Sequence, residues 1–192
     1  MPLPEPDAPC AHCLGSGIAH YDRVLAMAPF REPVRHLIHQ MKYHGRWAIA
    51  ELLADAWINK RLQLPADALL LPVPLHRIRQ VIRGFNQADV IARRIGKSCG
   101  LRLVHPAVRL KRTKNQSLTS SQAQRTDNLR DAFGLISPHK IRGRHVVVID
   151  DVMTTGATLL SLARVLREAQ PASLTALVIA RADPVSHDFQ SI

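Results

Sequence analysis

Residues 146–159 are Val-Val-Val-Ile-Asp-Asp-Val-Met-Thr-Thr-Gly-Ala-Thr-Leu, and this stretch decides the fold. The four apolar residues at its start need burial on both faces, which is typical of a central strand in a parallel sheet. Leu159, Leu162 and Leu166 then recur at helical spacing. An apolar run from Leu174 to Ala180 predicts a strand after that helix. Strand, helix and strand in succession imply a right-handed crossover, so we predict an α/β fold with a parallel sheet flanked by helices.

The rest of the chain supplies further elements of such a sheet. Apolar runs predict strands over residues 23–28, 69–74 and 106–110. Apolar residues at helical spacing predict helices over residues 33–44, 48–62 and 88–100, and Asn86 is the predicted N-cap of the last one. Between the second of these helices and the third, residues 77–83 are predicted to form a basic turn.

Two carboxylates and three threonines follow the central strand. Asp150 and Asp151 come at its C-terminal end, the edge of an open α/β sheet where ligands bind. The next helix offers unpaired N–H groups to an anion, and Gly156 allows its backbone to approach closely. The hydroxyls around that glycine can donate to phosphate oxygens. We therefore predict a phosphate cradle whose carboxylates face sugar hydroxyls or a divalent cation; its threonines are Thr154, Thr155 and Thr158.

An alternative for this segment is a strand, a turn and a helix in which Asp and Thr are ordinary N-caps. One threonine would suffice for capping, whereas residues 150–158 contain two carboxylates and three threonines around one glycine. The segment also lacks the Gly-Lys-Ser/Thr end of a Walker loop. A phosphate cradle of another kind is therefore favoured.

The charge of the chain is concentrated in its centre. The 192 residues include 26 Lys or Arg and 15 Asp or Glu, a net charge of +11. From His76 to Arg144, 16 Lys or Arg face only three Asp, a net charge of +13. Such a block predicts a polyanionic ligand, either a pyrophosphate-bearing metabolite or a nucleic acid backbone, unless it is simply a soluble basic surface. No apolar run reaches the ~18 residues that span a bilayer, and no signal-peptide pattern is present, so we expect a cytoplasmic protein without membrane contact.

The apolar run, the two acidic residues and Thr-Thr-Gly-Ala-Thr together resemble the signature that binds 5-phosphoribosyl 1-pyrophosphate (PRPP) in type I phosphoribosyltransferases. By this resemblance Asp150 and Asp151 hold the 2- and 3-hydroxyls of the ribose, while residues 154–158 hold its 5-phosphate. Mg²⁺ is the implied companion of PRPP. The implied PRPP-binding residues are Asp150, Asp151, Val152, Met153, Thr154, Thr155, Gly156, Ala157 and Thr158.

Other segments resemble the ComF/GntX-like branch of that family, which is named amidophosphoribosyltransferase-like and is associated with competence. The resemblance implies a Rossmann-like type I phosphoribosyltransferase domain with a small hood over residues 23–192, preceded by an N-terminal lead over residues 1–22. The segments that carry it are Leu37–Gly45, Pro72–Pro74, Arg83–Gln87, Arg109 to Gln116 with Arg125 and Asn128, and Ala180–Arg181.

PRPP carries a pyrophosphate at C1, so a second anion site is required. A loop after the predicted strand 69–74 and the polar stretch 111–125, which has the composition of a cationic lid, are the candidates. A stiff proline turn, a solvated charged turn and a basic loop without catalytic use are the alternatives. The predicted pyrophosphate-binding residues are Pro72, Val73, Pro74, Arg83, Lys111 and Lys114, and the predicted catalytic residues are Asp150, Asp151 and Arg112.

Cys10 and Cys13 are half of a possible zinc site, which His12 or His20 could complete. The ComF-like pattern has two such cysteine pairs near its N-terminus, and this chain supplies one. Either the chain begins downstream of the true start or the site is degenerate.

The resemblance leaves two main hypotheses for function. The first is an enzyme that moves ribose 5-phosphate from PRPP to a nitrogen nucleophile. The second is a non-catalytic protein of the same fold that binds nucleic acid or partner proteins during DNA uptake. A nucleobase acceptor would need an aromatic surface near the cradle, for which Phe85 and Phe133 are the candidates by sequence. The acceptor is not identified by the sequence, and a homo-oligomer is left open.

Overall fold

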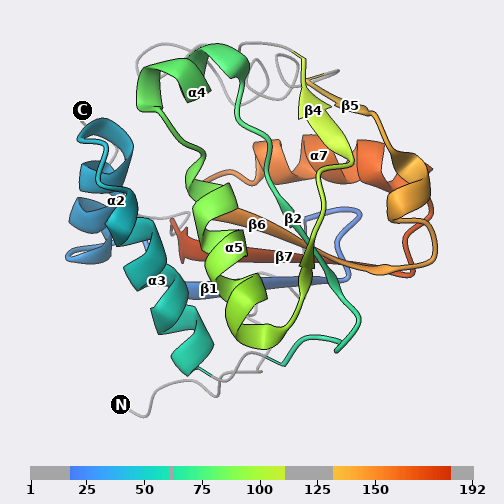
Figure 1. Cartoon of the computed structure of the whole chain (residues 1–192), viewed down its shortest axis with the longest axis horizontal. Coiled ribbons are helices and arrows are strands. Elements are labelled where there is room, and N and C mark those ends of the chain that lie inside the picture. Colours follow the sequence, from blue (N-terminus) through green and yellow to red (C-terminus); the bar gives the residue numbers. More distant parts are fainter. Residues whose placement is uncertain (1–17, 61–62, 111–131, 183–192) are drawn as a thin grey trace.

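The computed structural model describes residues 18–60, 63–110 and 132–182, and its centre is one parallel sheet (Figure 1). The sheet has five strands in the order β1-β7-β6-β2-β3, and all neighbours are parallel. The predicted parallel sheet is therefore confirmed. The strands are β1 (Arg23–Pro29), β2 (Leu69–Pro72), β3 (Arg102–Leu103), β6 (His145–Met153) and β7 (Ser173–Arg181).

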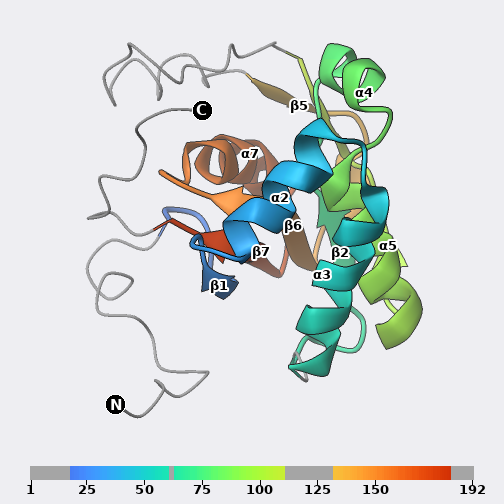
Figure 2. The ribbon, with the colours of Figure 1, turned by 90° about the vertical axis from the view of Figure 1, so that its left-hand side faces the viewer.

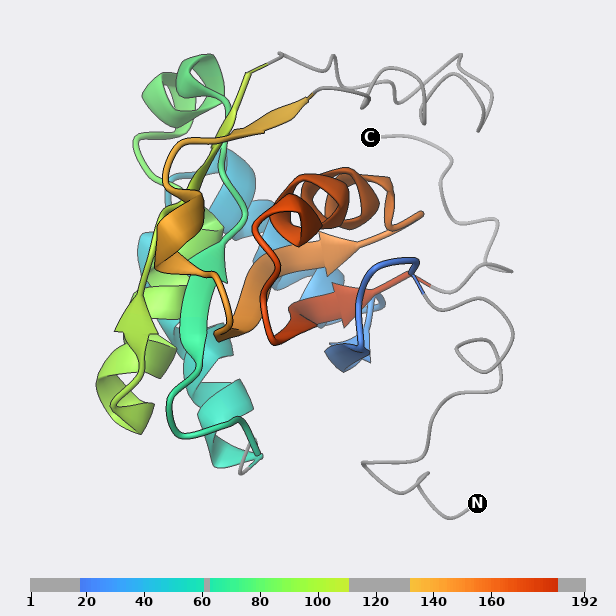
Figure 3. The same ribbon diagram turned by 90° about the vertical axis from the view of Figure 1, so that its right-hand side faces the viewer.

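Helices cover both faces of this sheet (Figures 1 and 2). On one face lie α2 (Val34–Tyr43), α3 (Trp47–Asn59) and α5 (Gln87–Cys99). On the other lie α7 (Ala157–Glu168), the two-stranded antiparallel pair of β4 (Ala107–Arg109) and β5 (Phe133–Leu135), and the 3₁₀ turn η1 (Pro138–Lys140) (Figure 3). Among the described helices, none is long and apolar enough to span a membrane.

Strand β6 joins the two layers because successive side chains of a strand point to opposite faces. Val146 and Val148 pack with the apolar residues of α7, whereas Val147 and Ile149 pack with those of α2, α3 and α5. All four side chains are at most 1% exposed. The apolar run at the start of the deciding stretch is thus buried on both faces, as predicted.

Two sequence predictions about element bounds were wrong. Residues 77–83 form a short helix, α4 (Arg77–Arg83), instead of a basic turn. The His76 side chain accepts a hydrogen bond from Ile78 N, and Gly84 ends the helix at a φ of +77°. Its apolar residues Ile78, Val81 and Ile82 do recur at helical spacing, but the segment is short and these side chains face solvent instead of the core. Strand β6 also continues past Asp150 to Met153, because Val152 and Met153 pair with the end of β7.

Asn86 caps α5 as predicted and also fastens the loop after β2. Its Oδ1 accepts a hydrogen bond from Ala88 N at 3.1 Å, and its Nδ2 donates to Val73 O at 3.1 Å. Val73 N in turn donates to Ile149 O at 2.9 Å. One side chain therefore links helix α5, the loop after β2 and, through that loop, strand β6.

Replacing Asn86 by Ala should lower the free energy of unfolding by about 1–2 kcal/mol, because the helix loses its cap and Val73 O loses a donor. Urea unfolding followed by circular dichroism measures this change. Asn86→Ser is the control, since it keeps a capping oxygen and should lose a smaller part of the stability. An Ala variant as stable as the natural protein would contradict this role.

Candidate functional site

The turn between β6 and α7 leaves the start of the helix without a side-chain cap. Gly156 is the N-cap residue at a φ of +73°, and no side chain caps it through a hydrogen bond. Thr154 and Thr155 are exposed, and the contact from Ala157 N to Thr155 Oγ1 is 3.4 Å, longer than an ordinary hydrogen bond. The capping alternative is therefore not what the threonines serve here. The hydroxyls and helical N–H groups of the turn are donors of the kind that bind an anion at a helix start.

The backbone angle of Gly156 favours glycine, and a side chain at this position would also have to displace Ile18. A Cβ at this position would lie 2.8 Å from Ile18 Cδ1 and 3.2 Å from Ile18 Cγ1. The segment that contains Ile18 is fixed to the same layer: Tyr21 Oη donates to Leu159 O at 3.2 Å, and Arg167 Nε donates to His20 O at 2.8 Å. Residues 18–22, which the sequence placed in the N-terminal lead, thus pack directly behind the cradle.

The two carboxylates lie at the end of β6, beside the turn. Asp150 Oδ1 accepts a hydrogen bond from Asp151 N at 2.8 Å, and Asp151 Oδ1 accepts one from Val152 N at 2.9 Å. Lys42 Nζ lies 2.7 Å from Asp151 Oδ2, and both side chains are largely buried. Helix α2 therefore supplies a counter-ion to a carboxylate that lies more than a hundred residues away in the sequence.

The two neighbouring carboxylates titrate in opposite directions. Burial and the adjacent Asp151 carboxylate together raise the pKa of Asp150 to about 8, while Lys42 acts against both. Burial also acts to raise the pKa of Asp151, but the charge of Lys42 and hydrogen bonds from Lys42 and Asp150 outweigh it and lower that pKa. The pair therefore favours keeping one proton near neutral pH, with the negative charge favoured on Asp151 beside Lys42.

Two arginines from other elements act electrostatically on this pair, and a third, Arg79, acts on one of them. Arg83 on α4 contributes to the lowered pKa of Asp151. Burial lowers the pKa of Arg109 on β4, and the charge of Arg79 lowers it further while Asp150 opposes the shift. The Arg109 guanidinium lies over the Phe133 ring, 5.3 Å from its centre. Lys42, Arg83 and Arg109 therefore bring positive charge from three elements to the carboxylates of β6.

The structure brings some of the predicted site residues together and leaves others aside. The residues of the turn and both carboxylates meet at one edge of the sheet, while Val152 and Met153 belong to strand β6 and Met153 is 5% exposed in the core. In the loop after β2, Val73 N already donates to Ile149 O, and Pro72 and Pro74 have no N–H group. Backbone N–H groups for an anion would therefore have to come from residues after Pro74. Phe133 is buried under Arg109 and Phe85 packs into the core. The candidates Cys10, Cys13, Lys111, Arg112 and Lys114 lie outside the described residues.

Sequence reasoning missed Lys42 and Tyr21. Lys42 lies in the predicted helix 33–44 but off the apolar stripe of Leu37, Ile38 and Met41, so its position predicts only a solvated side chain. Burial raises the pKa of Tyr21, and the charge of Asp150 raises it further, which places this phenol near the carboxylate pair. No pattern local to Tyr21 indicates that neighbour.

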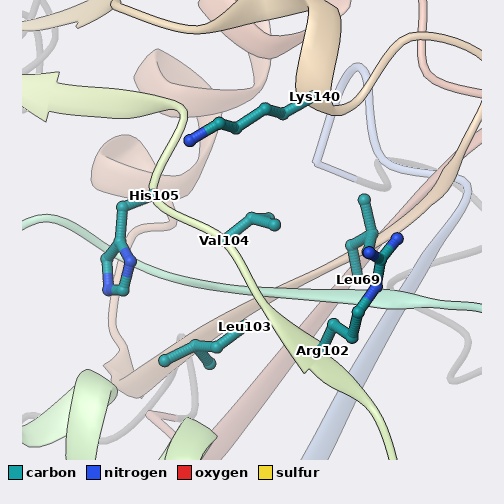
Figure 4. A pocket seen from close by; sticks show the side chains of 6 residues that line it. All are labelled: Leu69, Arg102, Leu103, Val104, His105 and Lys140. Carbon is teal, nitrogen blue, oxygen red and sulfur yellow. The ribbon is translucent and has the colours of Figure 1, made fainter.

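A hollow of about 450 Å³ lies at the other end of the sheet, near the start of β2 (Figure 4). It shares no residue with the site at the end of β6. Within the described ranges, no group of three or more His, Cys, Asp or Glu side chains is placed to hold a metal ion. The hollow is lined by Leu69, Arg102, Leu103, Val104, His105 and Lys140.

Comparison with known proteins agrees with the site geometry. Residues 82–188 match the family described as the phosphoribosyl transferase domain. The DNA utilization protein YhgH of Escherichia coli O6:H1 is 34% identical over 175 residues, which cover 86% of this chain and 74% of that protein. Competence protein F of Haemophilus influenzae is 30% identical over 197 residues, which cover 90% of this chain and 84% of that protein.

This chain belongs to the ComF-like family of type I phosphoribosyltransferases. Competence protein ComFC of Bacillus subtilis is a more distant relative, 30% identical over 155 residues that cover 79% of this chain and 61% of that protein. Among solved structures, glutamine PRPP amidotransferase from B. subtilis is 17% identical, with a TM-score of 0.44, over 70% of this chain and 26% of that chain. The fold assignment rests on the family match and on the parallel sheet, and both confirm the predicted fold class.

The carboxylate pair of this ComF-like protein should make its stability depend on pH. The pKa of Asp150 is about 8 in the folded protein against an ordinary value of 3.8, so the folded state keeps a proton that the unfolded chain releases. Stability should therefore fall as the pH rises from about 4 to about 8. Asp150→Asn should flatten this slope and be more stable than the natural protein at pH 8. Urea unfolding across this range measures both, and an equal slope in the two proteins would contradict the assignment.

A matched variant can distinguish two costs of a side chain at Gly156: the clash with Ile18 and the strain of the backbone angle. Gly156→Ala should cost about 2 kcal/mol or more, because it combines an unfavourable φ with a steric clash. Gly100→Ala has a similar φ of +68° with nothing within 4 Å, so it should show the strain alone. Ile18→Ala should reduce the cost of Gly156→Ala towards that of Gly100→Ala, as measured by thermal unfolding. Equal costs at the two glycines would argue against the clash.

Proposed function

We propose that this ComF-like protein is a PRPP-binding phosphoribosyltransferase that moves ribose 5-phosphate to a nitrogen acceptor. The observation that carries the proposal is the pair of partly buried Asp150 and buried Asp151, followed by exposed Thr154 and Thr155 at a helix start without a side-chain cap. A structural turn needs neither two adjacent carboxylates shielded from solvent nor a lysine paired with one of them. A ribose 5-phosphate would use both parts: the carboxylates for its hydroxyls and the turn for its phosphate.

In this proposal the turn binds the 5-phosphate and the carboxylates bind the ribose. The N–H groups at the start of α7 and the hydroxyls of Thr154, Thr155 and Thr158 donate to phosphate oxygens. The ionised Asp151 accepts a hydrogen bond from one ribose hydroxyl. The protonated Asp150 can donate to the other hydroxyl as well as accept from it. Lys42 keeps Asp151 ionised in a buried setting.

The guanidinium groups beside the carboxylates suit the pyrophosphate on C1. Arg83 and Arg79 on α4 follow the loop after β2, and planar guanidinium groups bind phosphate oxygens in pairs. Beyond the described residues, we propose Lys111, Lys114 and Arg112 as further contacts. As the C1–O bond breaks, its electrons leave with pyrophosphate and the sugar becomes cation-like, so fixed positive charge around the leaving group lowers the barrier. The nitrogen lone pair of the acceptor then forms the new bond to C1.

We propose that Mg²⁺ enters this site with PRPP. The carboxylate of Asp151 and the nearby oxygens of a bound pyrophosphate form the kind of oxygen donor set that Mg²⁺ prefers, and the described residues alone do not complete one. When bound, the ion would neutralise part of the charge on the leaving pyrophosphate.

A second candidate is a non-catalytic protein of the same fold that acts in DNA uptake. Its support is the basic block between His76 and Arg144, together with relatives named for DNA utilization and competence. Exposed aromatic residues are few, so such binding would rest on the nucleic acid backbone and weaken strongly with salt.

Calorimetric titration distinguishes the two candidates. The first predicts Mg²⁺-dependent binding of PRPP that is at least about tenfold tighter than binding of ribose 5-phosphate or pyrophosphate, because PRPP occupies both anion sites. Asp150→Asn combined with Asp151→Asn should abolish PRPP binding while the circular dichroism spectrum stays unchanged. Asp55→Asn, at an exposed carboxylate on α3, is the matched control and should bind PRPP normally. Failure of the natural protein to bind any of the three compounds would reject the enzyme and favour the second candidate.

A further inference from the structure

The hollow near the start of β2 has the size of a binding site for a small molecule. Its volume of about 450 Å³ falls within the range of about 300–1,000 Å³ that is typical of such sites. It lies at the end of the sheet away from the carboxylate pair, and none of its six lining residues belongs to the site at the end of β6 (Figure 4). A ligand in the hollow would therefore use residues that the phosphate cradle does not.

Part of the lining of this hollow is apolar. Leu69 is the first residue of β2, and Leu103 and Val104 are partly buried on and just after the neighbouring strand β3. A bare inorganic ion gains nothing from such a surface, whereas the ring or carbon skeleton of an organic ligand buries apolar area against it. The lining therefore suits a ligand with an apolar or planar body.

The charged side chains that line the hollow are basic. Arg102 on β3 and Lys140 on η1 are among its lining residues, and no Asp or Glu is. Among the described residues, neither of these two cations forms an ion pair or a side-chain hydrogen bond. Their two positive charges match the charge of about −2 that a phosphate monoester carries near neutral pH. A guanidinium binds two phosphate oxygens at once, and an ammonium adds a compact charge beside it.

Hydrogen bonds hold the segments that carry these side chains. Strand β3 is paired with β2. The Nε2 atom of His105 lies 2.7 Å from Asp89 Oδ1 on α5, which holds the imidazole at the border of the hollow. Ser137 N donates to Pro106 O at 3.2 Å, so the turn that carries Lys140 is tied to the segment after β3. A ligand would thus meet a preformed surface and bear little cost for ordering it.

We infer that this hollow binds a small phosphate monoester with a planar or apolar body, the class that includes nucleotides and pyridoxal 5′-phosphate. The Arg102 guanidinium and the Lys140 ammonium bind its phosphate, and its body packs against the apolar lining. A nucleic acid backbone would instead need phosphate contacts repeated along the surface, and it would leave the apolar lining unused. Because this second site shares no residue with the proposed phosphoribosyl transfer, either can exist without the other.

Labelling with pyridoxal 5′-phosphate tests this site at a known position. Its aldehyde condenses with a lysine amine, with loss of water, to an imine that borohydride reduces to a stable amine. Peptide mass spectrometry should find Lys140 labelled at least about tenfold more than Lys97, an exposed lysine in the last turn of α5, which is the scale of one charge-assisted hydrogen bond. Protection of Lys140 by AMP or GMP would identify nucleotides as the ligands, and selective labelling that neither prevents would identify a smaller ring phosphate.

Matched variants and one matched reagent separate phosphate binding from simple lysine reactivity. Arg102→Ala should lower the labelling of Lys140 to the level of Lys97, whereas Arg164→Ala, which removes an exposed arginine on α7, should leave it unchanged. Pyridoxal, which lacks the phosphate, should show no preference for Lys140.

Three results would overturn the site. One is equal labelling of Lys140 and Lys97 by pyridoxal 5′-phosphate. Another is a preference for Lys140 that persists with pyridoxal or in Arg102→Ala. The third is protection of Lys140 by a single-stranded oligonucleotide where AMP and GMP give none, since the surface would then bind a nucleic acid backbone. None of these results bears on the binding of PRPP at the end of β6.

Discussion

Burial of β6 on both faces is the constraint on which the rest of the structure depends. The strand is hydrogen-bonded to β7 on one side and β2 on the other, and its valines and isoleucine alternate between two apolar layers. A strand held in this way has no freedom to rotate or slide, because a shift of one residue would exchange its two faces. The positions of Asp150 and Asp151 at its end are thereby fixed, and so is the turn that follows.

The sequence could predict what is local. The apolar run, the glycine and the threonines of residues 146–159 fix a strand, a turn and a helix, and the cradle follows from them because all its residues are contiguous. Asn86 could be recognised as a cap for the same reason. Arg83 was predicted as a site residue from its place after the loop that follows β2, whereas Lys42 and Arg109 were not, because the approach of their elements depends on tertiary packing. Helix α4 was missed although Ile78, Val81 and Ile82 recur at helical spacing, because the segment is short and basic.

Electrostatics at the site works against stability. Two carboxylates share the end of one strand, and burial favours a proton on one of them. A ligand with hydroxyl groups and an associated cation would relieve this cost, while an Asn at either position would relieve it without a ligand. The site is therefore a place where the protein retains an unfavourable arrangement that packing alone does not explain, as is typical of binding sites.

The two outer strands of the sheet limit how this protein can associate with others. Strand β3 pairs with β2 over only two residues, and Pro106, which cannot donate a backbone hydrogen bond, follows shortly after it. At the opposite border, β1 ends at Pro29. The border at β3 thus offers few backbone groups to an incoming strand, whereas the seven residues of β1 form a longer border that only its last residue interrupts. Protection from edge-to-edge pairing is therefore stronger at β3 than at β1.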